Sequence, residues 1–458
     1  MRLLSLACAI ALGLSSVTTS AATPATAVPG SETIVSKTLA NGLKIIVWPD
    51  HDIPNANFYT FYKVGSRNEY PGITGLAHYF EHMMFNGTSK RAPGEFDRQM
   101  EAAGGSNNAS TSNDLTIYTD WFPSSALETI FDLEGDRMAN LAFDPKVIES
   151  ERGVVFSERR SSVDNDNFGS LLEQMQATAF TAHPYQFPTI GWPSDIEQWK
   201  LDDLKTFFKT YYAPNNAVLV IAGDVDPVQV FALADKYLAS LPKQPAPTPI
   251  TTVEPVQQGE RRLVVERADA QSPIVTYAFH TGLGAGSKDY PVLELLGTIL
   301  SQGESSRLHQ RLVENEQVAT QAGTFAEAGF DPGLLWIYAM LPPGGDMAKV
   351  EALLDDELAK LARDGVTADE LAKARNLKAS SFWRGMATIN GKARALGTYE
   401  VFNGDYRKLF DAPARYEAVT AADVKALAAR ILRIQNRTTG LLKPVAAAPT
   451  ADHKEAAQ

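Results

Sequence analysis

GLAHYFEHMMFNG, residues 75–87, is the most informative segment of this chain. Its apolar residues recur at helical spacing, and the closing Asn86-Gly87 pair is typical of a helix end. On such a helix His78 and His82 are four residues apart, so both imidazoles leave the same face one turn apart. Their nitrogens can therefore reach a single metal ion at the usual Zn–N distance of about 2.0–2.1 Å.

The same expected helix carries Glu81, three residues after His78 and on the same face. A water activated by zinc still needs a general base to take its proton, and we expect Glu81 to be that base. His-x-x-Glu-His is the inverted zincin motif of metalloproteases. Two surface histidines on an amphipathic helix would give the same pattern, so the motif alone leaves both interpretations open.

A third ligand is expected elsewhere, because zinc in hydrolases usually has three protein ligands and one open position. The charged, amphipathic segment 145–160 contains two candidates, Glu151 and Glu158. They are seven residues apart, which is two helical turns, and therefore share one helix face. Solvated charges on a surface helix would show the same spacing.

At this point the sequence resembles the M16 family of zinc peptidases, which includes pitrilysin, insulin-degrading enzyme and mitochondrial processing peptidase. In that family the third ligand is a glutamate some seventy residues after the second histidine, in the context Glu-Arg-x-x-Val-x-x-Glu. Here the corresponding separation is 158 − 82 = 76. The resemblance therefore implies that Glu158 is the third zinc ligand and that Glu151 supports the site.

The resemblance continues into the segment 104–118, which is similar to the family's edge strand. In the family this strand pairs with the backbone of the substrate. The resemblance places Asn108 at the edge of the cleft, where its amide is expected to bond to substrate backbone. It also implies two similar domains in one chain, which face each other across a chamber like a clamshell.

The domain organisation can be inferred from composition and from an internal repeat. The proline-rich run from 241 to 249 predicts a stiff, extended linker. Residues 203–216 and 423–436 share one pattern, each followed by an apolar strand, and their offset is 423 − 203 = 220. Such a long period indicates two copies of a domain rather than a solenoid. We expect an N-terminal domain over 30–241, a linker over 242–256 and a second domain over 257–445.

Each half mixes strands and helices without a regular βαβ order. Segments 45–48 and 58–62 are expected to be neighbouring strands, and 124–141 and 200–211 to be helices. The capping box at 367–370 predicts the start of another helix. The predicted fold class is α+β, with an antiparallel sheet in each domain and helices packed on one of its faces.

The termini predict export. Arg2 followed by an apolar run and small residues near Ala22 indicates a signal peptide over 1–22, so the mature protein is expected in the periplasm without a membrane anchor. Residues 446–458 are expected to be a disordered tail.

Cys8 is the one cysteine, and the formal net charge is −12. That charge argues against nucleic acid as a partner.

The second half lacks the zinc motif and departs from the family in a further respect. In the related enzymes it contributes an arginine and, seven residues later, a tyrosine that hold the substrate carbonyl. The corresponding positions here are Val313 and Thr320, which cannot replace them. Arg307 and Arg311 lie nearby and are candidates to replace the missing donors, although a role on the helix surface is the simpler interpretation.

The resulting prediction is a zinc-dependent endopeptidase that hydrolyses unstructured peptides, with Glu81 as the base. Because Val313 and Thr320 replace the family's arginine and tyrosine, the donors to the substrate carbonyl are missing. We therefore expect this chain to form a dimer, with a second copy or with a zinc-free paralogue, that completes the site. The alternative is a non-catalytic, structural M16 subunit. A complete set of His78, His82, Glu158 and Glu81 argues against that alternative, because a scaffold has no need of a general base.

Overall fold

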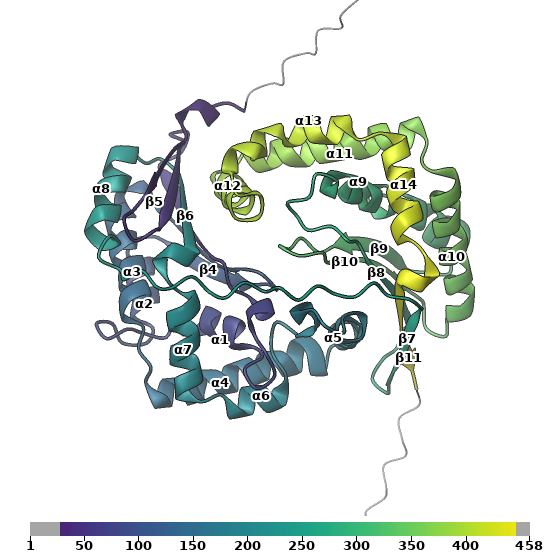
Figure 1. Ribbon diagram of the computed structural model, residues 1–458, viewed down its shortest axis with the longest axis horizontal. Coiled ribbons are helices and arrows are strands. Elements are labelled where there is room, and N and C mark those ends of the chain that lie inside the picture. The colour runs from purple at the N-terminus through teal and green to yellow at the C-terminus, as the bar shows by residue number, and fades with distance from the viewer. Residues whose placement is uncertain (1–27, 446–458) are drawn as a thin grey trace, which may run out of the picture.

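The computed structural model describes residues 28–445 and contains two β-sheets with helices around them (Figure 1). The first sheet has the strand order β1-β2-β6-β3-β5-β4, and the second has the order β7-β11-β8-β10-β9. The strands are β1 Val35–Thr38, β2 Lys44–Pro49, β3 Asn55–Tyr62, β4 Ser106–Thr111, β5 Thr116–Pro123, β6 Ala217–Gly223, β7 Arg261–Arg267, β8 Ile274–His280, β9 Gln321–Ala326, β10 Leu334–Met340 and β11 Arg437–Pro444.

Helices connect the strands in both halves. In the first half they are α1 Leu76–Met83, α2 Glu95–Ala102, α3 Leu127–Asn140, α4 Pro145–Arg159, α5 Asn167–Ala179, α6 Pro193–Gln198, α7 Leu201–Tyr211 and α8 Pro227–Tyr237. In the second half they are α9 Tyr290–Ser301, α10 Met347–Asp364, α11 Ala368–Met386, α12 Ile389–Asn403, α13 Ala412–Ala418 and α14 Ala421–Ile431. The predicted α+β class with two similar domains is confirmed, and the domains face each other like a clamshell (Figure 1).

The two sheets have the same topology, as the internal repeat predicts. Replacing β2, β6, β3, β5 and β4 by β7, β11, β8, β10 and β9 converts one strand order into the other. The strand β1 has no counterpart beside β7 among the described residues. The helices α7 and α14 begin at Leu201 and Ala421, so their offset of 421 − 201 = 220 equals the one found in the sequence.

The sheets are mixed rather than wholly antiparallel. β2 pairs with β6, and β7 with β11, in parallel, while the other neighbours are antiparallel. The last strand of each half returns after several helices and inserts between the first two long strands. The prediction that 45–48 and 58–62 are neighbours is therefore wrong, because β6 lies between β2 and β3. Local periodicity identifies a strand but not its partner.

The helices of each half cover one face of their own sheet. In β3, Phe58 and Tyr62 point into the core formed with α1, α3 and α7, and both are almost fully buried. Tyr59 and Phe61 point to the opposite face. Each large apolar side chain buried in this way stabilises the fold by about 1.5–3 kcal/mol. This packing fixes α1, the helix of the His-x-x-Glu-His motif, against the sheet.

The opposite face of each sheet is covered by a helix from the other half of the chain. α12 packs against the first sheet, where Ile389, Ala393 and Leu396 meet the outer residues of β2, β3 and β6. α5 packs against the second sheet, where Leu171 and Met175 meet β8, β10 and β11. These helices occupy equivalent places in the repeat, since 389 − 167 = 222. The two domains are therefore interlocked, which the sequence did not predict.

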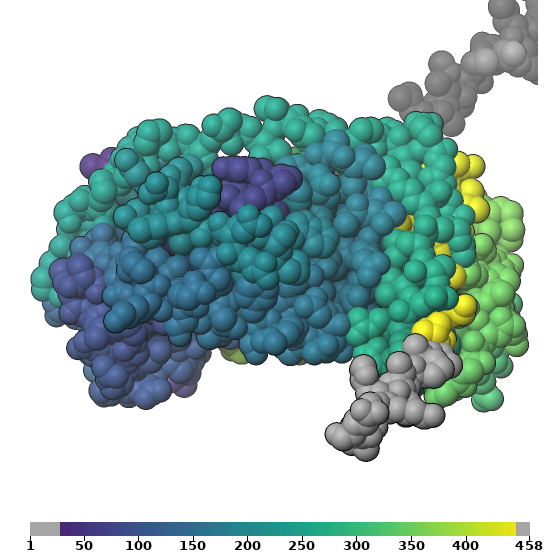
Figure 2. Space-filling view, turned by 90° about the horizontal axis from the view of Figure 1, so that it is seen from below, coloured from purple at the N-terminus to yellow at the C-terminus, as the bar shows by residue number. Residues whose placement is uncertain are grey.

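The linker crosses the molecule between the halves. Residues 242–258 hold neither helix nor strand, and they run from α8 to β7 across the view of Figure 1. In the space-filling view of Figure 2, the first half in purple and blue forms most of the face, and the second half in green and yellow forms one end. The predicted domain limits at 30–241, 242–256 and 257–445 stay predictions.

The expected signal peptide over 1–22 and the expected tail over 446–458 lie outside the described residues. Within 28–445, none of the helices has the length and apolar character needed to cross a membrane.

Candidate metal centre

α1 begins at a turn that is held by a buried carboxylate. Gly75, which precedes the helix, has a positive φ of 89° and no side chain with which to cap it. Instead Glu69, only 4% exposed, accepts hydrogen bonds from the backbone N–H groups of Gly75 and Ala77, both at 2.7 Å. Burial raises the pKa of Glu69 well above its ordinary value, against these two hydrogen bonds, which lower it. The start of the motif helix is thereby fixed.

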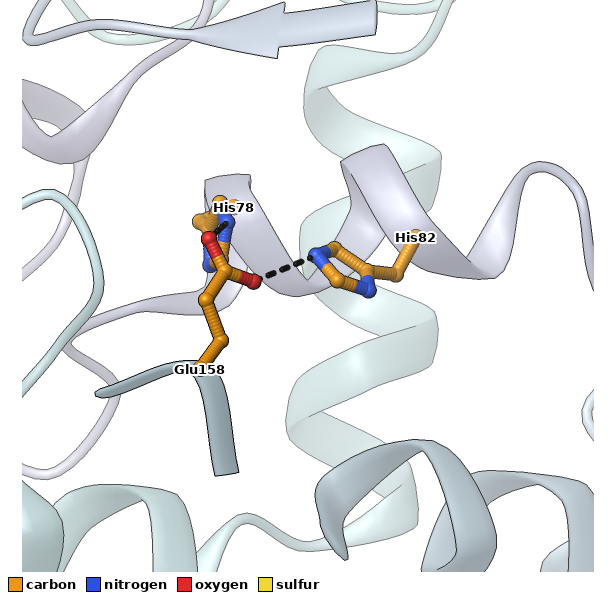
Figure 3. Close-up of side chains that lie close together, drawn as sticks. All are labelled: His78, His82 and Glu158. Carbon is orange, nitrogen blue, oxygen red and sulfur yellow. Dashed lines mark ion pairs between the residues drawn. The ribbon is translucent and has the colours of Figure 1, made fainter. Parts of the chain in front are cut away.

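The three predicted ligands, His78, His82 and Glu158, converge at one point (Figure 3). Glu158 places Oε2 at 3.2 Å from His82 Nε2 and Oε1 at 3.5 Å from His78 Nε2. One ligand atom from each residue lies within 4.8 Å of the other two. Ligand atoms around a tetrahedral zinc ion at about 2.0–2.2 Å are roughly 3.3–3.5 Å apart. Two imidazoles and a carboxylate with this spacing fit a zinc ion.

Glu151 orients one of the imidazoles. Its Oε1 lies 2.8 Å from His82 Nδ1, and its Oε2 accepts a hydrogen bond of 2.8 Å from Asn86 Nδ2. Asn86 also donates to the backbone oxygen of His82 at 3.1 Å. Because Nδ1 of His82 is engaged in this way, Nε2 is left facing Glu158. Such hydrogen bonds from a histidine ligand to a carboxylate recur in zinc sites.

The electrostatics of the group are those of a cation site. Burial lowers the pKa of His82, but the hydrogen bond and charge of Glu151, together with Glu158 and Glu81, raise it above its ordinary value overall. The hydrogen bond from His78 lowers the pKa of Glu158, against partial burial. The carboxylates therefore favour a positive charge at the point where the imidazoles meet.

The predicted base, Glu81, lies between the two histidines in sequence and is half-buried. Its Oε2 is buried and has no hydrogen-bond partner among the described residues. Most buried carboxylate oxygens are hydrogen-bonded, so an unpaired one beside a ligand cluster is an exception that a catalytic role would explain. His78 is 8% exposed and its Nδ1 is likewise without a partner in the described part of the chain.

The position of Glu158 depends on its neighbour Arg159. The guanidinium of Arg159 is buried, forms two hydrogen bonds of 2.8 Å with Glu173 on α5, and donates to the backbone oxygen of Gly191 at 2.8 Å. Gly191 in turn lies against Gly75, where a Cβ atom on either glycine would come within 2.9 Å of the other's Cα. Gly191 therefore contacts both the start of α1 and the end of α4, the two helices that carry the ligands.

Several of these supporting residues were missed by the sequence reasoning. Glu69 and Asn86 act through hydrogen bonds to backbone, and Arg159 acts through a contact with a distant helix. A carboxylate shortly before a helix start is a weak signal, since it does not match the usual capping position. No spacing rule identifies Arg159.

The expected substrate strand is present at the edge of the first sheet. β4 is that edge strand and pairs with β5. Asn108 is exposed, and its Oδ1 accepts the N–H of Ala109 at 2.9 Å. Ala109 contacts the core that contains α1, so the Asn108 side chain lies on the opposite face of the strand. Its role in binding substrate stays a prediction.

The second half places no free donor at the positions where the family has its arginine and tyrosine. Val313 lies half-buried against the core of the second half, and Thr320 bonds to the backbone oxygen of Met340 at 3.2 Å. Arg307 is held by Glu370 at 2.6 Å, and Arg311 pairs with Glu316 at 3.4 Å. These ion pairs support the surface role that was the simpler interpretation of both arginines.

Comparison with known families gives a consistent result. Residues 50–191 match the family described as "Insulinase (Peptidase family M16)", and residues 198–378 match "Peptidase M16 inactive domain". A relative from Helicobacter pylori named "Zinc protease PqqE" is 32% identical over 416 residues, which cover 89% of this chain and 92% of the relative. "Uncharacterized zinc protease YmxG" of Bacillus subtilis is 24% identical, and the match covers 89% of this chain and 97% of that relative.

Solved structures show the same fold. A protease from Helicobacter pylori superposes with a TM-score of 0.86 at 31% identity, covering 90% of this chain and 99% of that chain. The periplasmic protease PqqL of Escherichia coli superposes with a TM-score of 0.75 at 19% identity. In that comparison 93% of this chain matches 50% of the longer one.

Proposed function

This chain belongs to peptidase family M16, and we propose that it is a zinc-dependent endopeptidase that hydrolyses unstructured peptides. The observation that carries the proposal is the convergence of His78, His82 and Glu158 beside Glu81, whose inner oxygen has no partner in the described part of the chain. The ligands alone would suit a structural site. A free carboxylate next to them is what hydrolysis requires.

In the proposed reaction each residue has a separate role. His78, His82 and Glu158 would hold a zinc ion, which would supply Lewis acidity for the peptide carbonyl and for the attacking water. Glu81 takes a proton from the attacking water and delivers it to the leaving nitrogen. Glu151 keeps the His82 ring in place during both steps.

The edge strand β4 is the basis for proposing that the substrate binds in an extended conformation. An edge strand binds a peptide by adding it as a further strand, which requires an extended segment with free backbone groups. Folded proteins have already paired those groups, so we propose that they resist cleavage. Asn108 is included in this proposal only as an exposed residue of the edge strand.

We also propose that the active form contains two chains. Val313 and Thr320 cannot donate hydrogen bonds as the family's arginine and tyrosine do, and loss of such donors typically costs about 10²–10³ in rate for each one. The similar fold in PqqL is half of a longer chain, so further chain accompanies it there. A second copy or a zinc-free paralogue would supply the donors here.

A structural, non-catalytic subunit is the competing function. It is favoured by the match of residues 198–378 to an inactive domain. Most of that match lies in the half without the motif, and all of it follows the ligands and Glu81, which lie within residues 78–158. The proposed location is the periplasm, on the basis of the expected signal peptide over 1–22.

The proposed function is tested by separating metal binding from chemistry. Glu81→Gln is expected to keep its zinc and its fold but to lose hydrolysis of a disordered peptide by about 10²–10⁴-fold, because the amide cannot accept a proton. Glu101→Gln, an exposed change on α2, is the matched control. Turnover near the wild-type level in the Glu81 variant would point to the structural subunit or to another base.

A further inference from the structure

A cavity of about 330 Å³ lies away from the metal centre, where the linker crosses the second half of the chain. Its walls are His183, linker residues 252–257, residues 280–282, the 331–332 turn, the end of α14 at 430–431 and residues 433 and 436 of the following corner. None of the metal-centre residues lines it. Its volume is at the lower end of the range found for small-molecule sites.

One buried polar atom in the wall of the cavity lacks a partner. Gln257 is 6% exposed, and its Nε2 donates to the backbone oxygens of Gly259 at 2.9 Å and Arg437 at 2.7 Å. These two acceptors fix the orientation of the amide. Its Oε1 is therefore the remaining atom, and it is buried without a hydrogen bond within the described chain. Because this oxygen has almost no accessible surface, a ligand in the cavity does not reach it, and the role of Gln257 is to hold the linker wall against β11.

The acidic side chains at the cavity already have partners, whereas two arginines there form no ion pair among residues 28–445. Glu254 already accepts four hydrogen bonds, from the N–H groups of residues 181–183 and from Thr181 Oγ1, at 2.8–2.9 Å. Asp331 pairs with Arg67 and lies 3.1 Å from His183 Nε2. Arg430 and Arg433, by contrast, are exposed and take part in no ion pair among residues 28–445. An anionic group is therefore expected next to them.

Two exposed apolar side chains of the linker line the cavity. Val253 and Val256 are 81% and 74% exposed. Exposed apolar side chains gathered at the mouth of a cavity are characteristic of a binding site rather than of a random surface. A ligand with an apolar body would cover them.

From these features together we propose that the cavity binds the carboxyl-terminal end of a short peptide or an N-acylated amino acid with an apolar side chain. The carboxylate binds Arg430 and Arg433, and the apolar side chain lies against Val253 and Val256. This site is independent of the metal chemistry proposed above.

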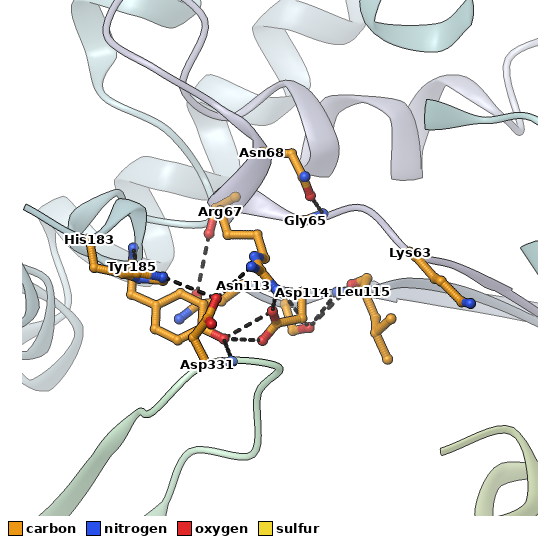
Figure 4. Close-up of polar contacts among 12 residues, drawn as sticks. Lys63, Gly65, Arg67, Asn68, Asn113, Asp114, Leu115, His183, Tyr185 and Asp331 are labelled. Atoms are coloured by element: carbon orange, nitrogen blue, oxygen red, sulfur yellow. Dashed lines mark hydrogen bonds and ion pairs between the residues drawn. The ribbon is translucent and has the colours of Figure 1, made fainter. Parts of the chain in front are cut away.

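The floor of the cavity is connected to the contact between the two halves. His183 and Asp331 belong to a polar cluster in which Arg67 binds Asp114 at 2.9 Å and Tyr185 donates to Asp114 at 2.8 Å (Figure 4). Arg67 and Asp114 come from the first half, and Asp331 from the second. A ligand that touches His183 and Asp331 therefore contacts the residues by which the halves are joined.

The probe for this site is N-acetyl-L-phenylalanine, titrated calorimetrically into the zinc-loaded chain. A ligand of this size is expected to bind with a Kd on the order of 1 mM. Its uncharged carboxamide should bind at least tenfold more weakly, since the amide cannot pair with the arginines.

Arg430→Gln combined with Arg433→Gln is expected to weaken binding of the acid at least tenfold and to leave the melting temperature unchanged, because both side chains are exposed. Arg384→Gln, an exposed arginine on α11, is the matched control. A carboxylate that bound the metal instead would be unaffected by the double variant. The proposal is overturned by unchanged binding in the double variant, by equal affinity for acid and carboxamide, or by no saturation at concentrations on the order of 10 mM.

Discussion

His82 Nδ1 lies 2.8 Å from Glu151 Oε1, and this hydrogen bond turns the other ring nitrogen, Nε2, toward Glu158. The pair joins α1 to α4, the two helices that supply the metal ligands. The ring would otherwise rotate about its side-chain torsions. The hydrogen bond thus contributes to metal affinity without contacting the metal.

Glu151→Ala is therefore expected to weaken zinc binding by about 10–100-fold, while zinc at saturating concentration still occupies the site. Competition with a chelator of known affinity measures the change. Glu149→Ala on the same helix is the control, because its side chain is 75% exposed and pairs only with Arg152 among the described residues. Equal affinity of the Glu151 variant and the wild type would show that His82 is held by other contacts.

Removal of any ligand should abolish the site. We expect about one zinc ion per chain, and loss of it in His78→Ala, His82→Ala and Glu158→Gln, because two remaining ligands bind zinc weakly. Elemental analysis of the purified variants measures the content. His51→Ala provides a control at an exposed histidine. Full zinc occupancy in all three ligand variants would end the assignment.

The two-chain proposal predicts low activity for the isolated chain and an increase of about 10²-fold or more when a cognate subunit supplies donors. The double variant Val313→Arg, Thr320→Tyr tests whether donors on this chain can replace those of the cognate subunit. Thr320 is exposed, but Val313 packs against the core of the second half, so the arginine will also cost stability.

The assay for that prediction is peptide turnover against partner concentration at constant zinc content, with a thermal melt of the double variant beside it. Full activity in a strictly single-chain preparation, unchanged by any partner, would contradict the two-chain model. Thr320→Tyr alone separates the new hydroxyl from the destabilising arginine.

A fourth prediction concerns stability and pH. Burial raises the pKa of Glu327 to about 7, although its carboxylate accepts a hydrogen bond of 2.9 Å from Trp336 Nε1. The folded state therefore holds a proton that the unfolded chain loses near pH 4.5. The resulting stabilisation is complete below that pH and is lost as the pH rises through the folded-state pKa.

Glu327→Gln should remove this dependence, because the amide is neutral at every pH. Relative to wild type, the free energy of unfolding of the variant should rise by about 1–3 kcal/mol between pH 5 and pH 8. Urea unfolding at several pH values measures it, with the exposed Glu304→Gln as control. A constant difference between Glu327→Gln and wild type would show that Glu327 is not the group responsible.

The sequence predicts much of the site because helical geometry depends only on residues close together in the chain. Four-residue spacing places His78 and His82 on one face of any α-helix, and the structure brings both to Glu158 as the family resemblance implies. The duplication was equally visible, because equivalent elements recur in the second half with a nearly constant offset.

The tertiary structure alone decided the long-range contacts. The insertion of β6 between β2 and β3, and the exchange of α5 and α12 between the two sheets, depend on which apolar faces pack best, and periodicity does not encode the partner. Glu69 and Arg159 act on the metal centre through backbone groups brought close only by folding. The cavity at Gln257 arises for the same reason, since the linker and the corner after α14 form its walls from distant parts of the sequence.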